Sequence, residues 1–498
     1  MLLCMSHMDR RRFLIASAAT AASLRTFAQT ASSPASAATI TLHRDKTGPV
    51  VPANFVGLSY ETQQLSEPSF FSAANKGLVE QFRALSPHGV LRIGGNTSDV
   101  GWWKPTPDSK KPPLPSNVKL QTPKGEKSPE DLAYAITPEA VRNLRAFLDA
   151  TGWTCIYGIN LGTNTPEVAA EQAVFVVKTL GPKLEYFQVG NEPDGFGRRF
   201  RDKATWNANT YLDDWLPVAN AIQASVPDAR FGLPDVAGNV GWLPTIADRL
   251  ASTPQHPKIA ALTHHYYFTG PPSNPNATIP NLLHANPKVQ RNGEMTRSAA
   301  EKLHVAYRMT EGNSCYRGGK PGFSDVFAAS LWAADYMLLL ASMGYSGVNL
   351  HGGEGKMVAD SLGGSLPGEA LMPDPKAPHP RPFYTPIADI GKDYVAEPVS
   401  YGMRFAGLFA GGTLLQLDFN PGEVNATAYA AKLAGGHTVV AIINKDESRE
   451  LMLNQPSWRL EQTLTAPSLT STNVRLGPAE SPKTNKVPAA SAAIFRVG

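Results

Sequence analysis

Two glutamates each stand at the end of a short apolar segment of the chain. Glu192 lies in Val-Gly-Asn-Glu-Pro, and Glu311 lies in Met-Thr-Glu-Gly-Asn, 119 residues further on. If both segments are strands of one parallel barrel, the two carboxylates face the same mouth and lie a few ångströms apart. Such a pair can cleave a glycosidic bond, because one carboxyl group protonates the leaving oxygen while the other attacks or activates water. Either glutamate alone is weak evidence, but the two together are specific.

Two polar residues near these segments fit the same chemistry. Asn191 precedes Glu192 and can donate a hydrogen bond to a sugar 2-hydroxyl, an interaction that strengthens in the transition state; the alternative is a structural amide that caps the strand end. Arg92 precedes Gly-Gly-Asn and is expected to point into the mouth, where its charge keeps the attacking carboxylate ionised. The alternative for Arg92 is a buried structural ion pair.

The motif His264-His265-Tyr266-Tyr267 ends another apolar segment. Neighbouring residues of a strand point to opposite faces, so His264 and Tyr266 share one face, and His265 and Tyr267 share the other. We predict Tyr266 as the hydrogen-bond donor that holds the attacking carboxylate, with simple core packing as the alternative. No metal site is predicted, because the sequence has no H-E-x-x-H motif and no cysteine near the pair. The absence of G-x-S-x-G argues against a serine hydrolase.

Eight apolar or β-branched segments end in polar or glycine-rich residues and alternate with helical patterns. The predicted strands are 55–61, 89–96, 154–162, 184–193, 229–238, 259–268, 305–314 and 346–353. The predicted helices are 76–85, 138–151, 166–180, 206–224, 243–250, 294–303 and 325–343. This alternation predicts a (β/α)8 TIM barrel over residues 53–398. An open doubly wound sheet is the competitor, but no glycine-rich nucleotide loop follows the first strand.

After residue 399 the pattern changes to short alternating segments separated by turns. Residues 399–498 therefore predict an all-β sandwich appended to the barrel. A strand-like segment precedes the first barrel strand, and we expect residues 38–52 to contribute a strand to that sandwich. The segment 355–381 is rich in Gly and Pro and is either a surface loop or a lid over one end of the cleft.

The first 37 residues carry the pattern of a twin-arginine export signal. Arg10, Arg11 and Arg12 precede an Ala/Ser/Thr-rich run that ends near residue 37. A membrane anchor is the alternative, but Ser, Thr and Arg25 interrupt the run. We therefore expect an exported protein, periplasmic or secreted. Cys155 and Cys315 would be the remaining cysteines, and we expect both thiols to be free.

The charge of the chain is nearly balanced. The 498 residues include 46 basic and 42 acidic ones, and removal of residues 1–37 takes away four arginines and one aspartate. The net charge near +1 that remains gives no general attraction to nucleic acid or to an anionic membrane. We expect neither as a partner, and we expect a monomer. A hydrophobic content of 42% excludes a disordered or fibrous chain.

Five stretches of the chain resemble glycoside hydrolase family 79, the β-glucuronidase and heparanase family within the retaining glycosidases of clan A. They are LRIGGN, VGNEPD, HHYY, MTEGNSCYRGG and FSDVFAASLWAADYMLLLASMG. The resemblance runs from about residue 55 to 353 and is most specific after Glu311. It implies a retaining mechanism with Glu192 as the general acid/base and Glu311 as the nucleophile, and it requires no metal or organic cofactor.

The resemblance also implies a site for the glucuronate carboxylate. It maps to Tyr316, Gly318 and Gly319, with Tyr384 as a further contact whose alignment the preceding insertion makes uncertain. Glycines expose backbone N–H groups to an anion, and a tyrosine hydroxyl adds a donor. Arg317 departs from the all-glycine run of the animal enzymes, and a solvated turn is the alternative for the whole segment.

Three activities remain open from the sequence. The first is a β-glucuronidase that removes a terminal glucuronate, which the length of the 355–381 insertion favours. The second is a heparanase-like enzyme that cuts inside a heparan-type polysaccharide, although the balanced charge gives no sign of the basic cleft such a substrate requires. The third is a catalytically silent carbohydrate-binding protein on the same scaffold. In each case the partner is a saccharide that contains glucuronic acid.

Overall fold

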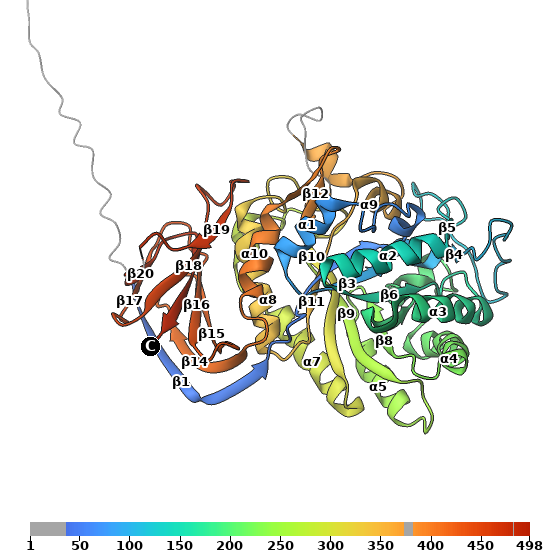
Figure 1. The fold of residues 1–498 in the computed structure, drawn as a ribbon, viewed down its shortest axis with the longest axis horizontal. Helices are drawn as coiled ribbons and strands as arrows, with labels where there is room; N and C mark the ends of the chain where they lie inside the picture. The colour runs from blue at the N-terminus through green and yellow to red at the C-terminus, as the bar shows by residue number, and fades with distance from the viewer. Residues whose placement is uncertain (1–35, 373–381, 482) are drawn as a thin grey trace, which may run out of the picture. The chain divides into compact units, whose positions relative to one another are not determined.

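The computed structural model describes residues 36–372, 382–481 and 483–498, which form a barrel and a β domain (Figure 1). Residues 1–35, which hold nearly all of the predicted export signal, lie outside the described residues, as do residues 373–381 of the predicted insertion. Strand β1, Ser36–Val50, includes the last two residues of the predicted signal, 36 and 37. Within the described ranges, no helix combines the length and the apolar character needed to cross a bilayer.

Eight parallel strands close into a barrel in the order β10-β11-β2-β3-β6-β7-β8-β9. Their bounds are β2 Val56–Glu61, β3 Val90–Gly94, β6 Thr154–Ile159, β7 Leu184–Val189, β8 Phe231–Val236, β9 Ile259–Thr269, β10 Ala306–Cys315 and β11 Val348–His351. Each of the eight predicted segments contains one of these strands or nearly all of it. The prediction of a TIM barrel with a C-terminal β domain is confirmed.

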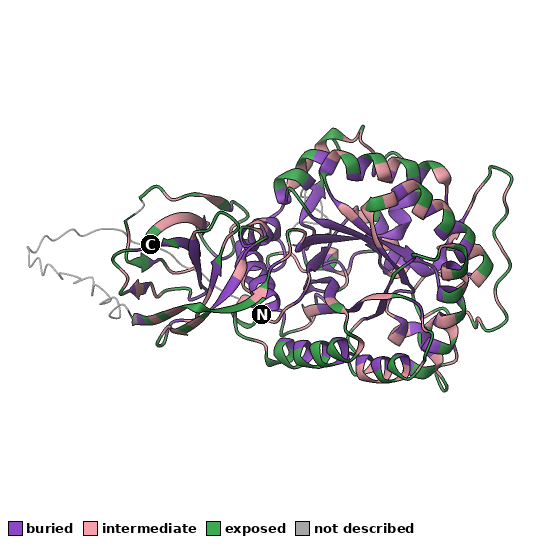
Figure 2. Ribbon diagram, turned by 60° about the horizontal axis from the view of Figure 1, so that its bottom comes forward, coloured by how far each residue is buried: buried purple, intermediate pink, exposed green. Residues whose placement is uncertain are grey.

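Helices surround the barrel, with buried faces toward the strands and exposed faces outward (Figure 2). They are α1 Lys76–Leu85, α2 Pro138–Thr151, α3 Pro166–Leu180, α4 Ala208–Ser225, α5 Trp242–Ala251, α6 Ile279–Leu283, α7 Pro287–Leu303 and α8 Phe327–Ser342. The sequence Thr-Pro-Glu starts both α2 and α3. In each, the threonine side chain accepts a hydrogen bond from a first-turn N–H and proline occupies the first turn, which is why these two helices begin so sharply.

The barrel extends further than the predicted boundary at residue 398. Helix α10, Pro398–Gly407, packs on α8, where the prediction had the first part of the sandwich. The two helices approach so closely at Gly402 that a Cβ there would lie 2.0 Å from the Ser330 carbonyl oxygen. This helix has only ten residues, and glycines interrupt its apolar pattern, so its sequence carries no clear helical period. The first strand after it is β14, Thr413–Asn420.

The β domain is a nine-stranded sheet in the order β19-β18-β21-β16-β15-β14-β1-β17-β20. Its remaining bounds are β15 Ala426–Lys432, β16 Thr438–Asn444, β17 Leu451–Leu453, β18 Arg459–Thr465, β19 Arg475–Pro478, β20 Lys486–Val487 and β21 Ser491–Val497. Strand β1 pairs antiparallel with β14 and, at its start, parallel with β17. The N-terminal segment thus joins the C-terminal domain, where the sequence places it.

Polar contacts join the β domain to the barrel at α8. Asp335 of α8 accepts hydrogen bonds from the Thr427 hydroxyl at 2.6 Å and from the Tyr429 hydroxyl at 2.7 Å, and it forms an ion pair with Lys445 at 2.5 Å. The Lys445 side chain is almost fully buried, so its charge needs this partner.

Elsewhere in the barrel, Cys155 and Cys315 are buried free thiols, as the sequence predicted.

Candidate active site

A cavity of about 500 Å³ opens at the mouth of the barrel, where the carboxyl ends of the strands meet. Its volume lies within the range typical of small-molecule sites, about 300 to 1,000 Å³. Glu192 and Glu311 both line it, together with Asn191 and Tyr384. The cavity therefore brings together residues that lie far apart in the sequence, from Glu61 to Tyr384.

Glu311 lies on β10 with its side chain 8% exposed. One oxygen accepts from Arg92 Nη1 at 2.7 Å, and the other accepts from the Tyr267 hydroxyl at 2.9 Å. His351 Nδ1 and His265 Nδ1 lie 3.7 and 4.0 Å away. Although burial acts in the opposite direction, these histidines and Arg92 hold the pKa of Glu311 well below its usual range. Glu311 is therefore a carboxylate at neutral pH.

A local irregularity of β10 determines where Glu311 points. The pairing of β10 with β9 shifts between Met309 and Glu311, so that Met309 lies opposite His264 and Glu311 lies opposite His265. A bulge of this kind changes which side chains face the interior. The next residue, Gly312, leaves no room for a side chain, because a Cβ there would lie 2.1 Å from the Tyr266 carbonyl oxygen.

Glu192 follows β7 in a left-handed conformation, with φ of 47°, which is uncommon for a residue other than glycine. Its backbone N–H donates to the Asp235 carbonyl at 3.0 Å, and His265 Nδ1 lies 3.1 Å from its carboxylate. The side chain is 24% exposed to the cavity. Burial raises the pKa of Glu192, the neighbouring Glu311 charge adds to this effect, and His265 opposes it.

The donor atoms of Glu192, His265 and Glu311 lie within 4.8 Å of one another. This spacing could hold a metal ion, but the surrounding charge is unfavourable to one. Arg92 already forms an ion pair with Glu311. Burial alone would lower the pKa of His265, but the carboxylates of Glu311 and Asp235 raise it to about 10. A protonated imidazole cannot bind a metal. That the chemistry needs no metal or cofactor stays a prediction.

Arg92 is the centre of the buried polar network. Its guanidinium forms ion pairs with Asp235 at 2.5 Å and Glu311 at 2.7 Å, and it donates to Asn191 Oδ1 at 2.8 Å and Gln188 Oε1 at 3.0 Å. The side chain is 1% exposed. The two predicted alternatives for Arg92 therefore hold together. Its charge lies beside Glu311 at the barrel mouth, and it also forms a buried ion pair with Asp235.

Tyr266 does not hold Glu311, contrary to our prediction. Its hydroxyl accepts a hydrogen bond from Asn286 Nδ2 at 3.0 Å, and its ring stacks on Tyr336 with 5.2 Å between centroids. Tyr267 makes the contact with Glu311 instead. The predicted alternation of side chains along this strand was correct, since Tyr267 and His265 both point into the barrel. The error was in which face of the strand turns inward, a choice that alternation alone leaves open.

The predicted carboxylate turn follows β10. Arg317, Gly318 and Gly319 all have positive φ, between 64° and 87°, and a Cβ on Gly319 would lie 2.7 Å from the Tyr384 backbone nitrogen. Tyr316 and Arg317 line the cavity together with the buried Tyr384, whereas the lining includes neither of the two glycines. The structure therefore brings the predicted residues into one turn but presents mainly its side chains to the cavity.

Sequence reasoning missed three acidic residues that build this site, one of which is Asp235, the buried ion-pair partner of Arg92. Glu61 ends β2, lines the cavity and accepts hydrogen bonds from both the N–H and the hydroxyl of Thr97, at 2.9 and 2.7 Å. Asp99 accepts from the backbone N–H groups of Leu161, Gly162 and Asn191, each at 2.9 Å, so it positions the Asn191 segment. Glu61 ends the predicted strand 55–61, so the rule that strand ends form the site could have found it, whereas Asp99 lies three residues beyond the predicted strand 89–96.

The chain has sequence similarity to curated β-glucuronidases. The one from Aspergillus niger is 26% identical over 316 residues, which cover 58% of this chain and 55% of that protein. The one from Neurospora crassa is 25% identical over 323 residues, covering 58% and 54%. The chain thus matches about half the length of these relatives. No protein-family model matches the chain.

Solved structures resemble the chain over 93% of its length and over their own full length. They include a 4-O-α-L-rhamnosyl-β-D-glucuronidase from Fusarium oxysporum (TM-score 0.63, 15% identity), a family 51 arabinofuranosidase from Xanthomonas axonopodis pv. citri (0.63, 16%) and a family 51 α-L-arabinofuranosidase from Bifidobacterium longum (0.65, 15%). At these identities the likeness shows the fold. The chain therefore has the barrel and β-domain architecture found in these glycosidases, and its sequence is distantly similar to β-glucuronidases.

Proposed function

We propose that the protein is a glycoside hydrolase that cleaves β-linked glucuronic acid with retention of configuration. The observation that carries the proposal is the pair of carboxylates at the barrel mouth, whose oxygens lie within 4.8 Å of each other. Retaining glycosidases have catalytic carboxyl groups about 5 to 5.5 Å apart, whereas inverting enzymes need about 6.5 to 9.5 Å to admit a water molecule. The spacing supports the retaining mechanism, and the curated relatives support the glucuronide.

The opposite directions of the two pKa shifts support the roles that we propose for Glu311 and Glu192. Glu311, kept ionised by its cationic neighbours, attacks the anomeric carbon and forms a glycosyl ester. Glu192, whose pKa is raised chiefly by burial, gives its proton to the leaving oxygen. Glu192 then takes a proton from water, and that water displaces Glu311 from the sugar. The proton returns to Glu192, so the cycle closes with one water consumed and one glycosidic bond broken.

Asn191, Arg92 and Tyr267 support this chemistry. Arg92 donates to the Asn191 side-chain oxygen, and one amide N–H of Asn191 donates to Asn96 Oδ1 at 3.3 Å. The other amide N–H can act as a donor toward a sugar 2-hydroxyl. Arg92 and Tyr267 each donate to one oxygen of Glu311. These two donors fix the carboxylate plane and favour its ionised form.

Tyr267→Phe is expected to lower kcat/KM on an aryl β-glucuronide by about tenfold to a hundredfold, because a hydrogen bond to a charged group is worth roughly 1.5 to 3 kcal/mol. The acid limb of the pH profile moves to higher pH, since the lost donor had stabilised ionised Glu311. Tyr266→Phe is the matched control and should change kcat/KM less than about threefold. A larger effect at Tyr266 than at Tyr267 would show that Tyr266, as the sequence predicted, is the donor that holds Glu311.

The cavity wall supports an anionic sugar. Tyr316 and Arg317, in the turn after β10, line the cavity, as does Tyr384, which follows β11. Their hydroxyls and the guanidinium can donate to a carboxylate on C5, which a neutral hydroxymethyl group would leave unpaired. These donors support a glucuronide, or another saccharide with terminal glucuronic acid, as the substrate class.

An aryl β-glucuronide is expected to be hydrolysed at least about a hundredfold faster, in kcat/KM, than the matching aryl β-glucoside, because each unsatisfied donor costs roughly 1 to 3 kcal/mol. Equal rates would contradict the carboxylate turn. Binding of the glucuronide with no turnover, by a protein with an intact thermal transition, would favour a carbohydrate-binding protein. Rapid shortening of a heparan polymer would instead favour the heparanase-like activity.

Export through the twin-arginine signal belongs to this proposal and would place the substrate outside the cytoplasm.

A further inference from the structure

A second cavity lies at the floor of the barrel, at the opposite end from Glu192 and Glu311. Its volume is about 200 Å³, and it is lined by residues at or near the amino ends of the barrel strands. Val90 and Ala306 begin β3 and β10, and Arg230 immediately precedes β8. We call it the floor cavity. Sites for organic ligands typically occupy about 300 to 1,000 Å³, so this volume suits a small ion with water.

Arg308 lines the floor cavity and is 4% exposed. Its guanidinium donates only to uncharged oxygens, which are Asn349 Oδ1 at 2.7 Å and the carbonyls of Ser346, Asn54 and Phe55 at 3.2, 3.3 and 3.4 Å. The three carbonyl contacts are longer than the usual distance of about 2.9 to 3.0 Å. No acidic residue within the described ranges forms an ion pair with Arg308. Its charge is therefore buried without a counter-charge.

The other buried arginines of the described chain have carboxylate partners. Arg92 pairs with Asp235 and Glu311, and Arg201 pairs with Asp214 at 2.6 Å. A buried cation without such a partner is costly, and burial accordingly lowers the pKa of Arg308. The floor cavity is the place where a counter-charge from outside the chain can reach this guanidinium.

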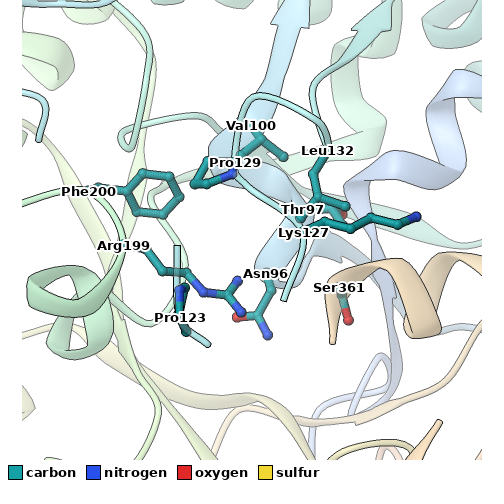
Figure 3. A pocket seen from close by; sticks show the side chains of 10 residues that line it. All are labelled: Asn96, Thr97, Val100, Pro123, Lys127, Pro129, Leu132, Arg199, Phe200 and Ser361. Atoms are coloured by element: carbon teal, nitrogen blue, oxygen red, sulfur yellow. The ribbon is translucent and has the colours of Figure 1, made fainter. Parts of the chain in front are cut away.

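The cations beside the active-site cavity do not need such a ligand. A space of only about 10 Å³ lies there, with Lys127, Arg199 and Ser361 in its wall (Figure 3). Lys127 Nζ lies 2.9 Å from Asp360 Oδ1, and Arg199 forms an ion pair with Glu126. That space has room for about one water molecule. The floor cavity differs from it both in its size and in the uncompensated charge of its arginine.

Tyr186 brings an unused hydroxyl to the floor cavity. The residue lines the cavity and is 8% exposed, and its buried hydroxyl has no hydrogen-bond partner among the described residues. Gly232 makes room for the ring, since a Cβ there would lie 2.4 Å from Tyr186 Cε2. Burial raises the pKa of the hydroxyl, and the charge of Arg308 acts in the opposite direction. The hydroxyl therefore stays protonated and can donate to an anion beside Arg308.

Glu185 determines which anion the floor cavity can accept. Within the described chain, the hydrogen bonds to its carboxylate come from Asn54 Nδ2 at 3.1 Å and the Thr154 hydroxyl at 2.7 Å, and both reach Oε1. Oε2 thus remains as an acceptor. Its charge repels an anion that has no proton, such as sulfate, whereas the P–OH group of hydrogen phosphate can donate to it while another oxygen accepts from Arg308.

We propose that the floor cavity binds a small oxyanion that carries its own O–H group, of the hydrogen phosphate class. Arg308 supplies the positive charge, Tyr186 supplies a hydroxyl donor, and Glu185 accepts the proton that the anion brings. The inference does not depend on the proposed function, because this site uses none of the contacts of Glu192 and Glu311. A bound anion of this kind stabilises the folded chain, since it binds the folded state only.

Thermal unfolding and titration calorimetry with inorganic phosphate test the proposal, with sulfate at the same ionic strength as the comparison. Phosphate is expected to raise the melting temperature in a saturable manner and to bind at least about tenfold more tightly than sulfate, which would leave Oε2 of Glu185 facing an unprotonated oxygen. A melting temperature independent of phosphate, with no heat of binding, would overturn the proposal. Equal affinities for the two anions would overturn the role of Glu185.

Substitutions locate the bound anion. Tyr186→Phe removes a hydroxyl without a partner in the described chain, so it should leave the melting temperature in phosphate-free buffer unchanged and weaken phosphate binding about tenfold. Arg308→Met should abolish measurable phosphate binding, because the charged donor is lost. Glu185→Gln should remove the discrimination against sulfate, since an amide N–H can donate to either anion.

Arg317→Met is the matched control, because it removes an arginine from the wall of the active-site cavity. Its phosphate affinity should equal that of the wild-type chain. Loss of phosphate binding in Arg317→Met, with wild-type affinity in Tyr186→Phe, would place the anion at the barrel mouth and overturn the floor site. Since Tyr186→Phe is expected to fold normally, this comparison holds even where Arg308→Met does not fold.

Discussion

Glu311→Gly is expected to lose nearly all hydrolysis of an aryl β-glucuronide and, with added azide, to form the α-glucuronosyl azide. Azide occupies the space of the missing carboxylate and attacks the same face of the sugar that Glu311 would attack, so the product is inverted relative to the β-linked substrate. Chromatography or NMR of the azide product reads the configuration directly. The loss without azide should exceed about a thousandfold, since a covalent catalytic group is removed.

Glu192→Gly should give the opposite stereochemistry. With a good leaving group the glycosyl ester on Glu311 still forms, and azide then replaces the water that Glu192 would have activated. The product is the β-glucuronosyl azide, with retained configuration. Exchange of the two products between the variants would reverse our roles. Glu192→Gln and Glu311→Gln serve as controls of shape: both should be inactive with an intact thermal transition, because the amide preserves volume and removes the chemistry.

The barrel could be predicted because its strands carry a local signal. Each is a short apolar segment that ends in polar or glycine-rich residues, and each such ending faces the mouth in a parallel barrel. The same rule brought Glu192, Glu311, Asn191 and Arg92 to one place. The signal is physical: interior strands of a closed parallel barrel are buried on both faces, so they are apolar until they reach the site.

What could not be predicted depends on contacts between distant segments. Alternation showed which residues of β9 share a face, but the shifted pairing of β10 with β9 sets how these faces meet Glu311, and so Tyr267 rather than Tyr266 reaches it. The ion pair between Lys127 and Asp360, which joins residues 104–133 to the segment after β11, is a stronger case. Lys127 and Asp360 lie in segments with no apolar period, and nothing local to either residue indicates its partner.

Arg92→Met is expected to destabilise the protein and to move the acid limb of its activity to higher pH. Removal of the guanidinium leaves the Asp235 carboxylate, 1% exposed, without its main charge partner, and breaking a buried pair in this way costs about 3 to 5 kcal/mol. The melting temperature should therefore fall clearly. Arg92 also holds the pKa of Glu311 low, so its loss raises that pKa.

The sign of the pH effect follows from the role of Glu311, which must be ionised to attack. In the wild-type chain its lowered pKa keeps it ionised well below pH 4.5, so activity persists at acidic pH until other groups titrate. With the pKa raised, Glu311 becomes protonated at a higher pH, and kcat/KM falls there. Arg92→Lys separates charge from geometry: a lysine keeps one cation near Glu311 but cannot contact Glu311, Asp235 and Asn191 together. We therefore expect Arg92→Lys to keep an acid limb closer to that of the wild type while losing kcat. An acid limb that stays in place in Arg92→Met would show that His351 and His265 alone keep Glu311 ionised.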